Sequence, residues 1–143
     1  MAAILLLEDG RGLYRSNLGY SVMLELIAEK IGDAHTRLRI WLADMADRTS
    51  PFCEFDLRGL TEDDRCEFWK AAARALAGLI EHHGPESTWA ANMYGGESLA
   101  HLMRMHRSIQ SGEPPSRLND LSQPVDFNGE PEDLDLLWNE KNA

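Results

Sequence analysis

The stretch that decides the expected fold is SNLGYSVMLELIAEKI, residues 16–31. Apolar side chains recur in it every three or four positions, which is the spacing of one face of an α-helix. That face consists of Tyr20, Met23, Leu24, Ile27, Ala28 and Ile31, with Leu18, Val22 and Leu26 at its margins. Because a helix that is apolar over most of its circumference is buried on several sides, we predict a central helix here. The alternative is that one side of this helix packs against a second copy, in a homodimer.

Two residues after this stretch predict how the chain continues. Gly32 suits the position that follows a helix, where the backbone takes a positive φ. Asp33 is placed to cap a second helix, which ends before Pro51. The apolar face of this second helix consists of Leu38, Trp41, Leu42 and Met45.

The clearest helix of the chain begins at Thr61. Residues 61–64, TEDD, are close to a capping box, and their three carboxylates suit the positive end of the helix dipole. Gly84 and Pro85 end this helix, and Gly78 in its interior predicts close approach of another helix. Shorter helical patterns follow at residues 87–94 and 97–110.

Two segments have no helical pattern. Residues 3–7, AILLL, fit either a short buried strand or an apolar arm, because length alone does not decide between them. Residues 52–60 are expected to form a connector. The sequence therefore predicts an all-α domain, a bundle of five or six helices over residues 1–112. An extended, proline-rich acidic arm over residues 113–143 follows it and ends in a short amphipathic helix.

The charge balance limits the classes of partner. The chain has 143 residues, with 24 Asp and Glu against 14 Lys and Arg and a net charge of −10. Nucleic acid is excluded as a partner because its binding needs a basic surface. No stretch approaches the roughly 20 apolar residues that span a bilayer, and no signal peptide is recognisable. With Cys53 and Cys66 expected as reduced thiols, we predict a cytoplasmic protein that does not bind membranes.

The charge is uneven along the chain. Residues 113–143 contain eight Asp and Glu against two Lys and Arg. Pro131 is suited to a first helical position, and Leu134, Leu137 and Trp138 follow at helical spacing. The arm either docks on its own domain through these apolar side chains or engages a basic protein, which negative charge steers toward it.

The candidate partner-binding residues lie in two places. Asp56 and Arg58 form a charge pair beside Gly59, and this pair either fixes the connector or contributes to a binding surface. The other candidates all belong to the arm and are Asp126, Glu130, Glu132, Asp133, Asp135 and Trp138.

No residue pattern indicates a nucleophile with its base, a phosphate-binding loop or a cofactor site. His82 and His83 are adjacent, so on a helix their side chains point in different directions, whereas a metal site needs ligands that converge. We expect no metal, no cofactor and no catalysis. A small enzyme that uses His82, His83 and Glu86 is kept as an alternative.

One part of the chain resembles a known class of proteins. The resemblance covers residues 38–76 and is carried by Trp41-Leu42 with Met45 and Arg48, by Phe55-Asp56-Leu57-Arg58-Gly59-Leu60, and by Arg65, Phe68-Trp69 and Ala71-Ala72. Together they resemble small bacterial immunity proteins, which neutralise a toxin made by the same cell. The resemblance implies an acidic, helical, single-domain inhibitor of a basic toxin or effector, and it implies no particular contact residue.

Overall fold

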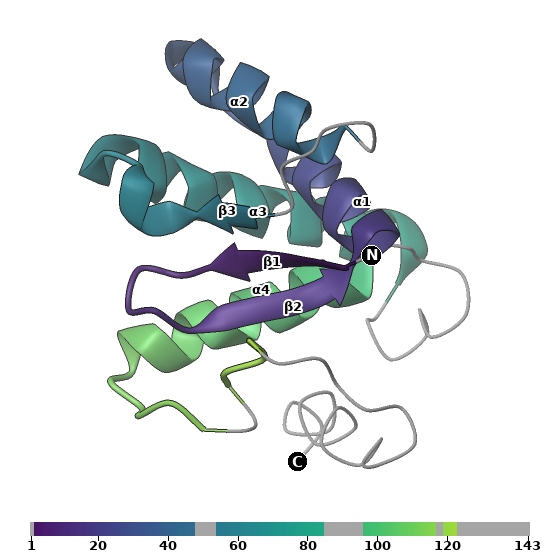
Figure 1. The fold of residues 1–143 in the computed structure, drawn as a ribbon. Coiled ribbons are helices and arrows are strands. Elements are labelled where there is room, and N and C mark those ends of the chain that lie inside the picture. Colours follow the sequence, from purple (N-terminus) through teal and green to yellow (C-terminus); the bar gives the residue numbers. More distant parts are fainter. Residues whose placement is uncertain (1, 48–53, 85–95, 117–118, 123–143) are drawn as a thin grey trace.

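A three-stranded sheet carries α-helices on one of its two faces (Figure 1). The computed structural model describes residues 2–47, 54–84, 96–116 and 119–122, and four α-helices and three strands lie within them. The all-α prediction is therefore wrong, because the chain combines helices with a mixed sheet.

The sheet begins with a hairpin. Strand β1, Ala2–Leu6, pairs antiparallel with β2, Gly12–Ser16. Gly10 allows the turn between them because its φ of 94° is accessible to glycine. Residues alternate between the two faces of a strand, so Ala3 and Leu5 point into the core and Ile4 points away from it. Residues 3–6 therefore belong to a strand and not to an apolar arm.

The third strand was missed from the sequence. Strand β3, Glu54–Asp56, pairs parallel with β1 and gives the sheet order β2-β1-β3. Phe55, the middle residue, is 1% exposed and lies between two acidic neighbours. Three residues are too few for a period-two pattern to stand out, and the pairing that creates the strand is with residues about 50 positions earlier.

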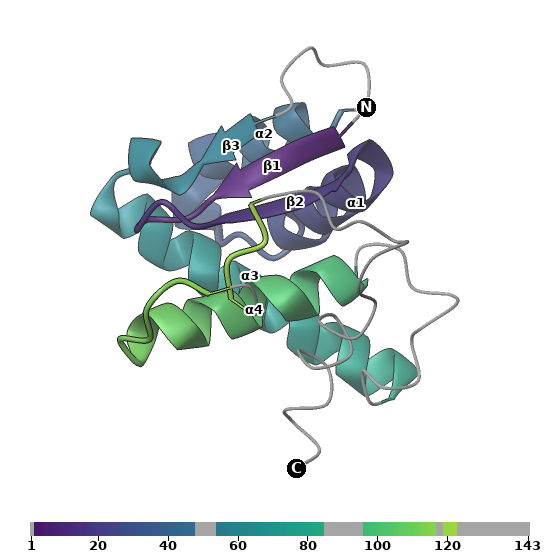
Figure 2. The same ribbon diagram turned by 60° about the horizontal axis from the view of Figure 1, so that its bottom comes forward.

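Helix α1, Asn17–Ala28, lies at the centre of the molecule, where it contacts the sheet and the other three helices (Figure 2). Met23, Leu24 and Ile27 are fully buried. This confirms the predicted central helix and explains why so much of its circumference is apolar. The predicted positive φ at Gly32 is wrong, because the residue has a φ of −67° and precedes a short 3₁₀-helix, η1, Asp33–His35.

Helix α2, Thr36–Ala46, follows η1 directly. Asp33 does not cap it: the helix begins after His35 without a side-chain cap, and the Asp33 carboxylate instead pairs with Arg39 at 3.2 Å. A second 3₁₀-helix, η2, Leu57–Gly59, connects β3 to the next helix.

Helix α3, Glu62–His83, begins as predicted. The Thr61 hydroxyl accepts a hydrogen bond from the Asp64 backbone N–H at 3.2 Å, which satisfies one of the donors left free at a helix start. The expected close approach of a helix at Gly78 is wrong for the described part of the chain, in which a Cβ atom there would meet nothing within 4 Å. Helix α4, Gly96–Gln110, matches the pattern predicted for residues 97–110.

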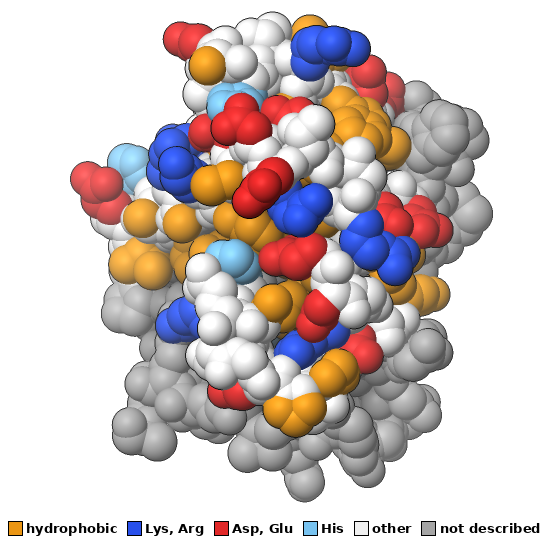
Figure 3. Space-filling view, turned by 90° about the vertical axis from the view of Figure 1, so that its left-hand side faces the viewer, with side chains coloured by type: hydrophobic (Ala, Val, Ile, Leu, Met, Phe, Trp, Pro, Cys, Tyr) orange, Lys and Arg blue, Asp and Glu red, His pale blue; other side chains and the backbone are white. Residues whose placement is uncertain are grey.

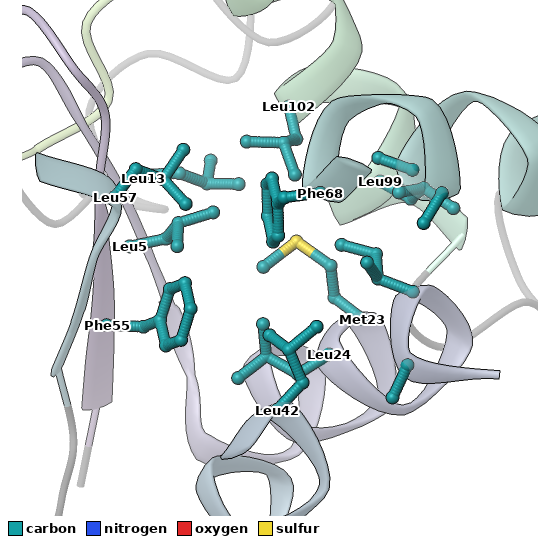
Figure 4. Close-up of a cluster of buried hydrophobic side chains, with 14 of the residues drawn as sticks. Leu5, Leu13, Met23, Leu24, Leu42, Phe55, Leu57, Phe68, Leu99 and Leu102 are labelled. Carbon is teal, nitrogen blue, oxygen red and sulfur yellow. The ribbon is translucent and has the colours of Figure 1, made fainter. Parts of the chain in front are cut away.

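The core lies between the sheet and the helices (Figure 4). The sheet supplies Leu5, Leu13 and Phe55, and the rings of Phe55 and Phe68 of α3 stack with centroids 5.9 Å apart. The remaining labelled side chains come from η2 and the other helices and are Met23, Leu24, Leu42, Leu57, Leu99 and Leu102.

The chain returns to the hairpin after α4. Arg11 is 4% exposed, and its guanidinium donates to Ser108 at 3.1 Å and to the Glu113 carbonyl. Asn119 donates to the same Ser108 hydroxyl at 2.7 Å. These bonds hold residues 113–116 and 119–122, the described start of the predicted arm, against the hairpin. Within the described residues, no helix has the length and apolar content that crossing a bilayer requires.

Candidate partner-binding face

The outer side of α2 presents large apolar side chains to solvent. Arg37, Ile40, Trp41 and Asp44 are spaced as one helix face, and all four are exposed. Ile40 is 56% exposed and Trp41 is 39% exposed. The sequence placed Trp41 on the buried face, where Leu38 and Leu42 do lie. Trp41 belongs instead to the border between the buried and the exposed sides of the helix.

The Trp41 ring packs against a residue of the sheet. Its ring centroid is 5.2 Å from that of Phe55 in β3, with the two planes at 53°. Phe55 is itself fixed in the core against Phe68. The indole therefore has one side against a rigid aromatic residue and the other side available, together with Ile40, for contact with another molecule.

Acidic side chains at the start of α3 lie next to His35, the residue before α2. Glu62 and Asp63 are exposed, and Asp64 is half-buried. Asp33 of η1 is exposed as well. Figure 3 shows this side of the molecule, where acidic side chains lie around a histidine and are interspersed with Lys and Arg side chains and apolar patches. We call Ile40, Trp41, Asp33, Glu62 and Asp63 the α2–α3 face.

His35 joins the two elements of this face. Its Nδ1 atom lies 3.0 Å from the Asp64 carboxylate, and its Nε2 atom lies 3.9 Å from Asp63 and 3.8 Å from Glu67. The hydrogen bond with Asp64 raises the pKa of His35, and the charges of the other two carboxylates act in the same direction. His35 thus holds the start of α2 against the start of α3.

The same residues are the ones that could hold a metal ion. Ligand atoms of His35, Asp63 and Asp64 all lie within 4.8 Å of one another. An imidazole with two carboxylates is a set that can bind a divalent cation in an open site. The hydrogen bond between His35 and Asp64 satisfies two of these atoms without an ion, and the positive end of the α3 dipole disfavours a cation there.

Asp56 and Arg58 form a close ion pair. The Asp56 carboxylate accepts from the Arg58 backbone N–H at 2.9 Å and from the guanidinium at 3.0 and 2.9 Å. The hydrogen bond from the Arg58 side chain lowers the pKa of Asp56. The pair caps η2 and fixes the connector between β3 and α3. A contact of the pair with a partner stays a prediction.

The other residues that the sequence analysis considered are the histidines at the end of α3, the acidic arm and Cys66. His82 and His83 are exposed at the end of α3 with ring centroids 6.5 Å apart, while Glu86 lies outside the described residues. The arm candidates also lie outside the described residues, and they are Asp126, Glu130, Glu132, Asp133, Asp135 and Trp138. Cys66 is a free, exposed thiol.

Two histidines, the half-buried His35 and the buried His101, have distant partners that the sequence does not reveal. His35 stands alone in its own segment because its partner Asp64 is 29 residues away. His101 is 1% exposed and accepts at Nδ1 from the Arg15 guanidinium. Burial, followed by the charges of Arg15 and Arg104, holds the pKa of His101 well below its usual value, so this imidazole is neutral. Helical periodicity marks the face on which such a residue lies but gives no sign of its partners.

Comparisons of the chain with protein-family models, with curated proteins and with solved structures gave no match.

Proposed function

We propose that this protein is a non-catalytic, acidic protein-binding module that acts in the cytoplasm as an immunity-type inhibitor of a bacterial toxin. The observation that carries the proposal is the exposed pair Ile40 and Trp41, with the Trp41 ring held against Phe55. In this account, the α2–α3 face covers a basic surface of the toxin.

The apolar part of this face has the features of an interface centre. Binding energy is concentrated in a few residues, among which tryptophan is enriched, and these residues are surrounded by contacts that exclude water. Trp41 loses little freedom on binding because Phe55 already holds its ring. Reduced ordering of side chains increases affinity for the same buried area.

The acidic part of the face supports a basic partner. The chain carries a net charge of −10. Asp33, Glu62 and Asp63 are exposed, and Asp63 lies 3.9 Å from His35, the residue that precedes the helix with the apolar pair. Complementary charge accelerates encounter and rejects acidic competitors, while the apolar centre supplies most of the lasting affinity. Fast association suits an inhibitor that must capture its toxin before the toxin reaches its target.

The burial of α1 within its own chain weakens the case for a homodimer. The side chains of α1 that suggested it are buried in the core of the same chain. Only the marginal residues Leu18, Val22 and Leu26 are partly exposed.

The experiment is a protection assay. The product of the gene adjacent to this one is expressed in a bacterial host with and without this chain, and survival is counted. We expect the chain to restore survival and Ile40→Asp to abolish the protection. Ile80→Asp is the matched control, because Ile80 is also exposed, at 41%, but lies on α3 away from the face. A toxic neighbour against which the unmodified chain gives no protection would contradict the proposal, as would equal loss with both variants.

A further inference from the structure

The outer face of the β1–β2 hairpin, opposite the helices, is apolar, whereas β3 places Glu54 and Asp56 on this side of the sheet beside Ile4 and Leu6. Residues paired across neighbouring strands share a face, so Ile4 lies beside Tyr14, and Leu6 beside Gly12, on the outer side. Ile4, Leu6 and Tyr14 are each partly exposed. Figures 1 and 2 show all four described helices on the other side of the sheet. Among the described residues, no helix covers this face.

The described part of the chain ends beside this face. The Tyr14 backbone N–H donates to the Leu121 carbonyl at 2.7 Å, and Leu121 forms a parallel bridge with Leu13. Ser122 lies over the outer side of β2, because its Cβ is 3.0 Å from the position that a Cβ on Gly12 would take. Leu121 and Ser122 therefore lie at the β2 edge of this apolar face.

We propose that this face is the docking site of the chain's own C-terminal residues 123–143, through Leu134, Leu137 and Trp138. These three residues recur at the spacing of one helix face, and as an apolar set they need a surface to cover. The twelve positions from Ser122 to Leu134 reach up to about 40 Å, whereas a five-residue strand is about 17 Å long. The segment can therefore reach any point of the outer face.

Two observations favour this occupant over a separate molecule. The segment is attached at Ser122, so its local concentration at the neighbouring face is high. In addition, Glu132 and Asp133 precede Leu134 in the sequence, and Asp135 follows it. Once Leu134 and Trp138 face the sheet, these carboxylates are left toward solvent. The sheet then gains a second apolar layer whose outside is acidic.

The test uses nuclear Overhauser contacts in the full-length chain. We expect contacts between the Trp138 indole protons and the methyl groups of Ile4 and Leu6. A sample that mixes two differently labelled copies distinguishes contacts within one chain from contacts between chains. Contacts only between chains would identify a second copy as the occupant and overturn the proposal. Contacts of Trp138 with Ile40 and Trp41 instead, or no contact of Trp138 with the sheet, would overturn it as well.

Matched variants add a second readout. Changing Leu134, Leu137 and Trp138 together to Asp is expected to shift the methyl signals of Ile4 and Leu6. Leu136→Asp is the control, because Leu136 lies on the opposite side of the same helical pattern and is expected to leave those signals in place. Equal shifts from both changes would contradict the docking. The contacts in the unmodified chain decide the question even where a variant folds poorly.

Discussion

His35 shows how a single residue links two elements and makes their junction depend on pH. It faces three carboxylates of α3, from Asp63, Asp64 and Glu67, and Glu67 is paired on its other side with Arg74 at 2.7 Å. The pKa of His35 is raised in the folded chain. The folded state therefore binds this proton more tightly than the unfolded state does. The resulting stabilisation is complete below the unfolded pKa, about 6.5, and is lost as the pH rises through the folded pKa.

Replacing this imidazole tests the junction. We expect His35→Gln to lower the free energy of unfolding more at pH 5.5 than at pH 8.5, as measured by urea unfolding. His82→Gln is the control, since His82 is exposed at the end of α3. A loss of the same size at both pH values would show that His35 acts through packing and not through its charge.

His101 is expected to behave in the opposite way. Burial lowers the pKa of His101 well below 6.5, so the unfolded chain takes up a proton that the folded chain excludes. This contribution to stability is present above about pH 6.5 and is lost as the pH falls toward the folded pKa. In an NMR titration from pH 7.5 to 5.5, the ring signals of His101 should stay fixed. A midpoint near 6.5 would contradict the buried, neutral state.

At the scale of elements, the start of α3 depends on one hydroxyl. The Thr61 side chain accepts from the Asp64 backbone N–H, and replacing an N-cap threonine by alanine costs about 1 kcal/mol. We predict that Thr61→Ala lowers the free energy of unfolding by about that amount in chemical unfolding. Thr36→Ala, which removes an exposed hydroxyl bonded to the Asp33 carbonyl, should cost less. Equal costs would argue against the cap.

The segment after α4 depends on Asn119. Its amide group donates to Ser108 and to the Pro114 carbonyl, and its carbonyl oxygen accepts from the Ser116 N–H. We expect Asn119→Ala to loosen the segment, so that the Tyr14 amide, which donates to Leu121, exchanges with solvent at least about tenfold faster, equivalent to about 1.4 kcal/mol. The Leu5 amide inside the hairpin serves as the reference. An unchanged rate at Tyr14 would show that Asn119 is not the tether.

Elements with long periodic patterns were predictable, and those made by distant contacts were not. The burial of α1 and the cap of α3 followed from local spacing and local hydrogen bonding. Strand β3 did not, because three residues carry no detectable period and its partner is β1. Trp41 was misplaced because an apolar residue at helical spacing is usually buried, whereas its position borders solvent. His35 was overlooked because its carboxylate partners belong to another helix.

At the scale of the whole molecule, apolar and acidic surface occur together. The core uses the inner face of the sheet and the inward sides of the helices (Figure 4). Outside the core, Ile40 and Trp41 of α2 are exposed, and so are Asp33 of η1 and Glu62 and Asp63 of α3. In the proposed function, burying the two apolar side chains in a protein interface removes them from water, and the acidic side chains of the protein favour a basic partner.

The most direct test of the proposed function is a calorimetric titration of the chain with the product of the adjacent gene, which the proposal expects to be the toxin. We predict that Trp41→Ala weakens binding by about 30-fold or more, the loss of about 2 kcal/mol expected at the centre of an interface. Ile80→Ala should leave the affinity unchanged, with circular dichroism confirming that both variants are folded. An affinity unaffected by Trp41→Ala, or reduced equally by Ile80→Ala, would contradict the assignment of the binding site to the α2–α3 face.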